Sequence, residues 1–137
     1  MGNKLVLVVD DEPIGLEMIA SVLEADGYSV LQASDVRSAI EILENNKTTI
    51  NVILMDLVMP EYNGFVAIRT IKTQKLTRLI PVMALTASTD KESVRKAMNV
   101  GADDYLTKPF EPSDLLSRVR TLCKISDFVK RWGAYAR

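Results

Sequence analysis

The chain alternates short apolar segments with longer segments in which apolar residues recur every three or four positions. A short apolar run that stops at polar residues is typical of a strand buried on both faces, and the longer spacing is typical of an amphipathic helix. Five short segments therefore predict strands at Leu5–Val9, Ser29–Ala33, 51–55, 81–85 and Asp104–Thr107.

Each predicted strand is followed by a predicted helix. Pro13 suits the first helical position and Gly27 ends the first helix. Ser34 is expected to cap the second helix, Gly101 ends the fourth, and the fifth starts near Pro112. The apolar positions of the first helix are expected at Ile14, Met18, Ile19, Val22 and Leu23. Repeated strand–helix units predict an α/β fold, a doubly wound parallel sheet with its ligand site outside the carboxyl ends of the strands.

The composition limits the kinds of catalytic and metal sites that the chain can form. The chain has 137 residues, which suits one domain, and it contains no histidine and one cysteine. These counts exclude a Ser-His-Asp triad, a Cys-His pair, a histidine-ligated metal, an internal disulfide and a Cys-x-x-Cys motif within the chain. The remaining carboxylates, amines and hydroxyls suit hard cations such as Mg²⁺.

The charge and hydropathy of the chain give no sign of a membrane or nucleic-acid partner. There are 17 basic and 18 acidic residues, a net charge of −1, and no basic stripe, so we expect no direct nucleic-acid binding. The apolar runs are too short to span a bilayer and the N-terminus has no signal-peptide pattern. A cytoplasmic protein with no membrane partner is therefore expected.

Polar side chains follow four of the five predicted strands. Asp10 and Asp11 follow the first, Asp56 the third, Thr86 the fourth and Lys108 the fifth. Three carboxylates at one sheet edge repel each other unless a cation lies among them, and oxygen ligands suit Mg²⁺. Carboxylates, a metal, a lysine and a hydroxyl are the groups that hold a phosphoryl group, and one carboxylate can accept it. Taken singly, the acidic pair also suits a helix N-terminus, and the lysine a solvated loop.

The ordered motifs resemble a known family. They are VVDDE at 8–12, LMDLVMP at 54–60, ALTA at 84–87 and GADDYLTKPF at 101–110. This set resembles the receiver domains of bacterial two-component response regulators, including the chemotaxis response regulator, over about residues 4 to 123. The resemblance implies a flavodoxin-like fold with strand order 2-1-3-4-5 and five helices.

The resemblance also implies residue roles at the acidic edge. Asp56 matches the phospho-acceptor. Asp11 and Asp56 match direct Mg²⁺ ligands, Asp10 matches a position that helps to hold the ion through water, and Val58 matches the position that gives its backbone carbonyl to the metal. An apolar Val58 cannot position water, so we predict no fast self-dephosphorylation.

Further matches concern the response to phosphorylation. Thr86 matches the switch hydroxyl, Ala87 a residue whose backbone N–H reaches the phosphoryl group, Lys108 the lysine that pairs with it, and Tyr105 the aromatic switch. The bond between Lys108 and Pro109 matches one that is usually cis in the family.

The implied function is phosphoryl transfer to Asp56 from the phosphohistidine of a sensor histidine kinase or a histidine phosphotransfer protein. Because the chain has no histidine, the donor must be another protein or a small phosphodonor. Phosphorylation would switch the surface of the fourth helix, fifth strand and fifth helix to control an output domain, a partner protein or a homodimer. Such a domain catalyses only its own phosphorylation and dephosphorylation.

Three other functions compete with this one. A receiver-like adaptor would bind partners without phosphorylation, but the complete set of acidic, hydroxyl and lysine residues argues against it. An aspartate-nucleophile phosphatase of the haloacid-dehalogenase type usually has a second Asp at the position of Val58. A flavodoxin-like cofactor binder would need a phosphate loop, and the glycines form no Gly-x-Gly pattern.

The sequence allows more than one role for the C-terminal part of the chain. We assign residues 1–123 to the receiver domain and 124–137 to a helical extension. Apolar residues continue at helical spacing, and a helix over 112–135 would be about 36 Å long at 1.5 Å per residue, longer than the sheet is wide. A linker to an output domain, a dimerisation helix and a frayed end remain open. Cys123 is expected to pack in the core.

Overall fold

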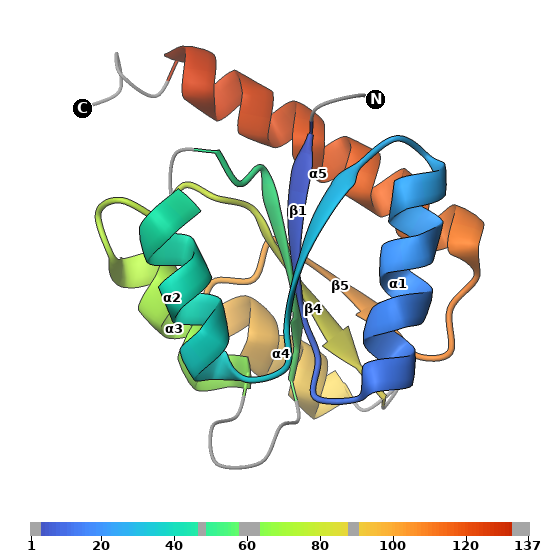
Figure 1. Cartoon of the computed structure of the whole chain (residues 1–137). Coiled ribbons are helices and arrows are strands. Elements are labelled where there is room, and N and C mark those ends of the chain that lie inside the picture. Colours follow the sequence, from blue (N-terminus) through green and yellow to red (C-terminus); the bar gives the residue numbers. More distant parts are fainter. Residues whose placement is uncertain (1–3, 47–48, 58–63, 88–90, 133–137) are drawn as a thin grey trace.

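The computed structural model describes residues 4–46, 49–57, 64–87 and 91–132. Its centre is a five-stranded sheet in which all neighbouring strands are parallel and the order is β2-β1-β3-β4-β5 (Figure 1). The strands are β1 (Leu5–Val9), β2 (Ser29–Ala33), β3 (Val52–Asp56), β4 (Val82–Thr86) and β5 (Asp104–Thr107). The predicted fold and strand order are confirmed.

Helices cover both faces of this sheet. They are α1 (Pro13–Ala25), α2 (Val36–Asn46), α3 (Gly64–Thr73), α4 (Lys91–Asn99) and α5 (Pro112–Trp132). The core on one face contains residues of α2, α3 and α4, and the core on the other contains residues of α1 and α5 (Figure 1). The sheet is therefore doubly wound, as the strand–helix alternation predicts.

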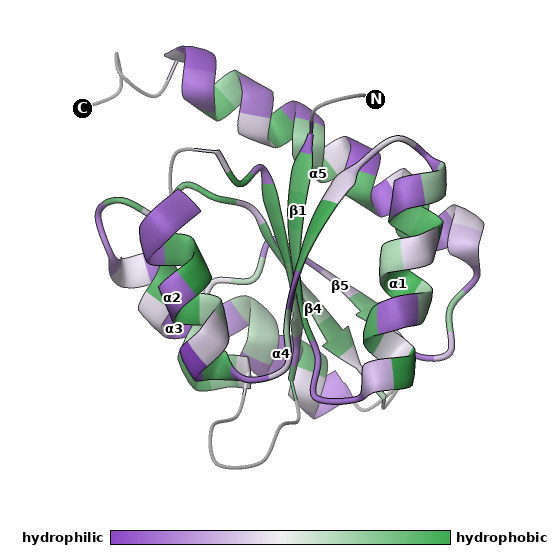
Figure 2. Ribbon diagram, in the orientation of Figure 1, coloured by the Kyte–Doolittle hydropathy of each residue, from purple (hydrophilic) through white to green (hydrophobic). Residues whose placement is uncertain are grey.

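Alternate residues of each central strand serve the two cores. Leu7 and Val9 belong to the core under α2, α3 and α4, whereas Val6 and Val8 belong to the core under α1 and α5. All four have no exposed surface. This two-sided burial explains why the strands are continuous apolar runs, which appear green along the centre of Figure 2.

Two strands end one residue later than the sequence predicts. β3 and β4 both include a final polar residue, because Asp56 aligns with Leu85 and Thr86 aligns with Thr107 in the sheet register. At the other end, Pro81 cannot donate a backbone hydrogen bond, and it lies outside β4. The sheet itself therefore holds the backbones of Asp56 and Thr86.

The helix ends agree with the sequence except at α2. Gly27 and Gly101 have positive φ angles of 95° and 116° and lie one residue beyond the ends of α1 and α4, so these two predictions are confirmed. The predicted cap of α2 at Ser34 is wrong. Asp35 caps this helix, because its Oδ1 accepts a hydrogen bond of 2.7 Å from the backbone N–H of Ser38. That hydrogen bond lowers the pKa of Asp35 below its ordinary value.

The buried face of α1 also differs from the prediction. Ile14 is 82% exposed and Met18 is 50% exposed. Ile19 and Leu23 are buried as predicted, and Val22 is partly buried against the same core. Leu16 and Ala20 are buried in place of Ile14 and Met18, so that the buried positions follow the spacing i, i+3, i+4, i+7.

Helix α5 is the longest element and extends past the end of the sheet (Figure 1). It packs on the sheet through Leu115, Val119, Leu122, Cys123 and Ser126. Cys123 is 1% exposed, which confirms its expected place in the core, and burial raises the pKa of its thiol. Tyr135, the predicted end of the helix, lies outside the described residues. Among the described residues, no helix is long and apolar enough to span a membrane.

Candidate functional site

The carboxyl ends of four strands meet at one edge of the sheet. Asp10 directly follows β1, Asp56 ends β3, Thr86 ends β4 and Lys108 directly follows β5. Since β1, β3, β4 and β5 are consecutive in a parallel sheet, all these residues emerge on the same edge. This edge is where doubly wound folds bind ligands.

Asp10 is the most buried charged residue of this edge, with no exposed surface. Its Oδ2 accepts a hydrogen bond of 2.7 Å from Nζ of Lys108, which is 98 residues away in sequence. Its Oδ1 accepts a hydrogen bond of 3.0 Å from the backbone N–H of Glu12, where α1 begins. Asp10 therefore holds the backbone just before α1 and also pairs with the lysine.

The carboxylates of Asp10, Asp11 and Asp56 form one cluster, in which one oxygen of each lies within 4.8 Å of the others. Asp10 and Asp56 are buried and Asp11 is exposed. Three carboxylates beside the single Lys108 leave two surplus negative charges within this group. The donor set fits Mg²⁺, which binds oxygen at 2.0–2.1 Å and keeps several waters, so that not every carboxylate must touch the ion.

Thr86 and Ala87 lie where β4 ends. Thr86 is buried, and its backbone carbonyl accepts a hydrogen bond of 2.7 Å from the backbone N–H of Lys108, which ties the ends of β4 and β5 together. Ala87 follows it and is exposed. The peptide bond between Lys108 and Pro109 is cis.

Tyr105 lies apart from the acidic cluster, on the surface formed with α4 and α5. Its side chain is partly exposed, and the guanidinium of Arg118 lies 5.9 Å from its ring centroid. Arg118 is fixed in turn by ion pairs with Asp104 and Asp114. A hollow of about 390 Å³ between α4 and β5 is lined by Lys91, Val94, Arg95, Tyr105 and Thr107. The ring of Tyr105 therefore borders an open space next to the strand that ends at the site.

One position of the predicted site cannot be compared with the structure. Val58, the proposed carbonyl ligand, lies with the rest of 58–63 outside the described residues. Its role stays a prediction.

Gly64 is a positioning residue that the sequence patterns above do not single out. A Cβ on Gly64 would lie 2.2 Å from the backbone oxygen of Asp56 and 2.7 Å from the Cα of Leu57. The backbone N–H of Gly64 also donates to the carbonyl of Leu57 at 2.8 Å. The first residue of α3 is thus pressed against the end of β3, and only glycine fits there. The signal in the sequence is the Asn-Gly pair shortly after Asp56.

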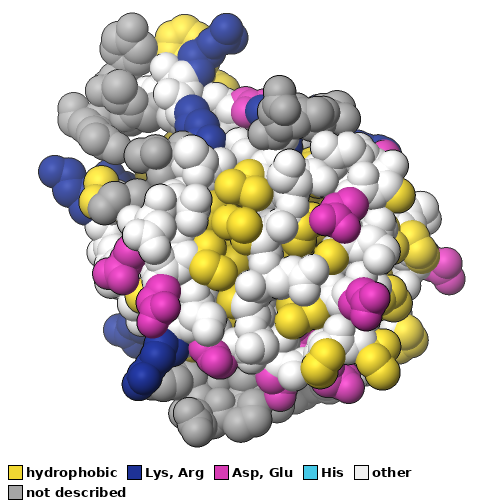
Figure 3. All heavy atoms as spheres, in the orientation of Figure 1, with side chains coloured by type: hydrophobic (Ala, Val, Ile, Leu, Met, Phe, Trp, Pro, Cys, Tyr) yellow, Lys and Arg dark blue, Asp and Glu magenta, His cyan; other side chains and the backbone are white. Residues whose placement is uncertain are grey.

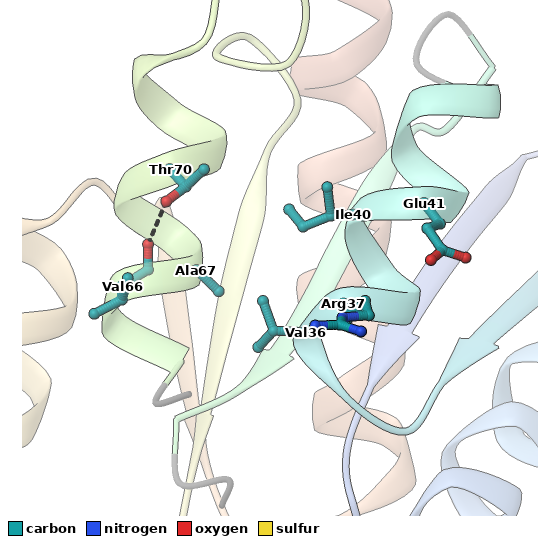
Figure 4. A pocket seen from close by; sticks show the side chains of 7 residues that line it. All are labelled: Val36, Arg37, Ile40, Glu41, Val66, Ala67 and Thr70. Carbon is teal, nitrogen blue, oxygen red and sulfur yellow. Dashed lines mark hydrogen bonds between the residues drawn. The ribbon is translucent and has the colours of Figure 1, made fainter. Parts of the chain in front are cut away.

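A second hollow, of about 290 Å³, lies between α2 and α3 (Figure 4). Val36 and Ile40 point across it from α2, and Ala67 points back from α3. Its charged lining residues are Arg37 and Glu41, one of each sign, so it has none of the surplus charge of the acidic cluster. The lining of this hollow therefore lacks the negative charge that would favour a cation.

Comparison with known proteins gives a consistent picture. The family model described as "Response regulator receiver domain" matches residues 6–120. The chain is similar to the phosphate regulon transcriptional regulatory protein PhoB of Pseudomonas aeruginosa, with 37% identity over 90% of this chain and 53% of that protein. It is also similar to the response regulator SaeR of Staphylococcus aureus, with 37% identity over 85% of this chain and 49% of that protein. The chain spans about half the length of these relatives.

Solved structures agree with the sequence comparison. A putative response regulator from Chloroflexus aurantiacus matches with a TM-score of 0.83 and 30% identity, over 88% of this chain and 98% of that one. The chemotaxis protein CheY4 of Vibrio cholerae matches with a TM-score of 0.80 and 32% identity, over 87% and 98%. Both similarities cover nearly the whole of the solved chains.

Proposed function

Because the chain belongs to the response regulator receiver domain family, we propose that it accepts a phosphoryl group on Asp56 in two-component signalling. The observation that carries this proposal is the cluster of Asp10, Asp11 and Asp56, with Lys108 bound to Asp10, at the carboxyl edge of the sheet. The family and its signalling role do not depend on the proposal, but the phosphoryl transfer, the metal and the output do.

Asp56 is better placed to accept the group than its two neighbours. Asp10 lies one residue beyond β1 and has no exposed surface, and its oxygens are directed at Lys108 and the backbone N–H of Glu12. Asp11 follows the strand and is exposed, so its position is less constrained. Asp56 is the last residue of β3, between β1 and β4, and is 8% exposed. A nucleophile fixed by the sheet keeps its orientation at little entropic cost.

In the transfer step, a carboxylate oxygen of Asp56 attacks phosphorus and forms the O–P bond. The P–N bond to the donor imidazole breaks, its electron pair stays on nitrogen, and the imidazole takes up a proton. Mg²⁺ held by Asp10, Asp11, Asp56 and the Val58 carbonyl would neutralise phosphoryl charge. Lys108 supplies a fixed positive charge beside the same carboxylates.

Phosphorylation would add negative charge at the sheet edge where Thr86 ends β4 and Lys108 follows β5. Lys108 would exchange Asp10 for the phosphoryl group, and the Thr86 hydroxyl and Ala87 backbone N–H would bind its oxygens. Tyr105, which borders the hollow between α4 and β5, would turn inward as Thr86 moves. The surface of α4, β5 and α5 would change as a shift between two populations.

The partners follow from the same chemistry. A sensor histidine kinase or a histidine phosphotransfer protein supplies the phosphoryl group, since the chain has no histidine of its own. An output domain or partner protein, or a homodimer through α4, β5 and α5, receives the signal. The absence of direct nucleic-acid contacts and the cytoplasmic location stay predictions.

The proposal is tested by incubating the protein and its Asp56→Asn variant with acetyl phosphate and Mg²⁺ and measuring intact mass. We expect phosphorylation of the parent protein and none of the variant, because the amide is a poor nucleophile. Asp127→Asn is the matched control, since Asp127 is an ion-paired aspartate on α5, remote from the site, and it should be labelled like the parent. Equal labelling of Asp56→Asn would refute the assignment, and steady phosphate release from simple phosphoesters would favour a phosphatase instead.

A further inference from the structure

Two hollows lie one after the other between α2 and α3. The first, of about 290 Å³, is lined by Val36 and Ile40 of α2 and by Ala67 of α3 (Figure 4). The second, of about 180 Å³, is lined by Ile40 and Leu43 of α2 and by Leu76. Because Ile40 lines both, the hollows form one α2–α3 groove. Val36 and Leu43 are seven residues apart on α2, which is about 10 Å at 1.5 Å per residue.

The rim of the α2–α3 groove carries exposed apolar side chains. Val66 lines the first hollow and is 51% exposed, and Leu76 lines the second and is 59% exposed. The hydroxyl of Thr70, which also lines the first hollow, donates to the backbone carbonyl of Val66 at 2.9 Å, so its hydrogen is already used. An apolar side chain is therefore the occupant that the first hollow suits best.

Charges of both signs flank the same groove. Glu41 lines the first hollow and Glu44 the second, whereas Lys75 and Arg78 lie on either side of Leu76 in sequence. These side chains are exposed, and none of them forms an ion pair with another described residue. Acidic and basic side chains both lie over α2 and α3 on the face drawn in Figure 3. The groove thus has an acidic rim on α2 and a basic rim around Leu76.

We propose that the α2–α3 groove binds the same groove of a second copy of the chain, with Leu76 of each copy inserted into the first hollow of the other. A two-fold axis between the hollow and Leu76 makes both contacts at once, as an isologous pair requires. A cavity of ~150 Å³ holds a benzene ring, so the first hollow has room for a leucine side chain. The proposal concerns α2, α3 and the segment after α3, and it does not depend on phosphorylation of Asp56.

The distribution of charge favours a second copy over another kind of partner. The two-fold axis places the basic neighbours of Leu76 beside the hollow that Glu41 lines, so that opposite charges meet on both sides of the axis. A partner of a single charge sign would leave the acidic rim or the basic rim against like charge. The groove is therefore complementary to itself both in shape and in charge.

The interface is small, which sets its expected strength. A few apolar side chains per copy bury less than the roughly 1,200 Å² of a standard stable interface. We therefore expect a dimer that dissociates on dilution. High salt should weaken it further, because the charges on the rims are exposed and are screened by ions.

Sedimentation equilibrium over a wide range of protein concentration tests the contact made by Leu76. We expect a monomer–dimer equilibrium in the parent chain and an association weaker by about tenfold or more in Leu76→Glu, because the hollow has no partner for a buried carboxylate. Phe128→Glu is the matched control, since Phe128 is 64% exposed on α5, which covers the other face of the sheet, and its association should match the parent. A monomer at every concentration would overturn the proposal, and so would a dimer that Phe128→Glu weakens and Leu76→Glu does not.

Charge reversal tests the pairing of the rims with two further variants. One variant combines Glu41→Lys with Glu44→Lys, and the other combines Lys75→Glu with Arg78→Glu. Each variant alone should associate more weakly than the parent, because like charges then meet across the axis, and an equimolar mixture should recover the parent's association through mixed dimers. A mixture that associates no better than the separate variants would contradict the pairing. Circular dichroism checks that each variant is folded.

Discussion

Two lysine–aspartate pairs lie at opposite edges of the same sheet. Lys108 binds Asp10 at 2.7 Å at the carboxyl edge, and Lys72 binds Asp103 at 3.0 Å near the amino ends of β4 and β5. In both pairs the lysine is partly buried. Both contacts join an ammonium group to a carboxylate, but the balance of charge around the two pairs differs.

The pair at the amino edge is balanced. Lys72 also donates to the backbone carbonyl of Ile80 at 2.9 Å, and Asp103 also accepts from the backbone N–H of Val82 at 2.8 Å. One positive and one negative charge meet there, and each also binds the backbone. Such a network fixes a loop to a strand and leaves no charge to attract a ligand.

The pair at the carboxyl edge is unbalanced. Asp11 and Asp56 add two negative charges beside the pair of Asp10 and Lys108. Like charges that are held close together store unfavourable energy, which a cation relieves. Charge surplus and not the ion pair itself therefore distinguishes the candidate site from structural support.

The largest expected effect separates the two lysines. Lys108→Met should slow phosphorylation of Asp56 about 100-fold, in line with the loss of one preorganised charge-stabilising group. Lys72→Met should leave the phosphorylation rate unchanged and lower the free energy of unfolding by about 1–3 kcal/mol, because Asp103 loses its partner. Rates with acetyl phosphate and Mg²⁺, together with urea unfolding, measure both.

One other outcome would contradict the distinction between the two edges. If Lys72→Met slowed phosphorylation as much as Lys108→Met, the amino edge would also serve the reaction, and the distinction drawn from charge balance would be wrong. Restoration of part of the rate by Lys108→Arg would show that charge is the property required of Lys108.

Replacing the aspartate of each pair by asparagine should have a smaller effect on stability, and its sign should be opposite at the two edges. Asp10→Asn removes one of three clustered carboxylates and a fully buried charge, so the metal-free protein should gain about 1 kcal/mol of stability. Asp103→Asn removes the partner of Lys72 without relieving any such repulsion, so it should lose about 1 kcal/mol. Thermal and urea unfolding in the presence of a chelator measure the difference.

Unfolding in the presence of Mg²⁺ is a second test of the two variants Asp10→Asn and Asp103→Asn. A ligand at 100 times its dissociation constant stabilises the folded state by about 2.7 kcal/mol. The parent and Asp103→Asn should both show this gain, and Asp10→Asn should show less of it. Loss of stability in metal-free Asp10→Asn would mean that the helix N-terminus and Lys108 need the Asp10 charge more than the cluster suffers from it.

The fold was largely predictable because its strands are buried on both faces. Five apolar segments placed all five strands to within one residue. The finer choices depend on tertiary contacts. Whether Ile14 or Leu16 faces the sheet is decided by the approach of α1, and both fit the helical period. Ser34 and Asp35 are both good caps, and the position of the first turn selects Asp35.

The site was predictable as a set of strand ends but not as a set of contacts. A parallel sheet brings Asp10, Asp56 and Lys108 to one edge whatever the details of packing. The pairing of Lys108 with Asp10 joins residues 98 positions apart, and nothing local in the sequence indicates it. The same holds for the fit of Gly64 against Asp56, which depends on the exact position of α3.

The smallest effect concerns Asp35, a carboxylate that is balanced by a helix N-terminus and not by a lysine. Its pKa is lowered by the hydrogen bond from the backbone N–H of Ser38. A lowered pKa in the folded state means that the ionised group stabilises the protein above the ordinary value of 3.8, and that this stability is lost as the pH falls through the folded value. Asp35→Asn keeps a capping oxygen but cannot titrate in this range. The parent should therefore be slightly more stable than Asp35→Asn at neutral pH, and the difference should vanish in acid, as measured by urea unfolding at a series of pH values. A difference that stayed constant with pH would show that the cap acts through its geometry alone, so that charge balance would distinguish only the two lysine–aspartate pairs.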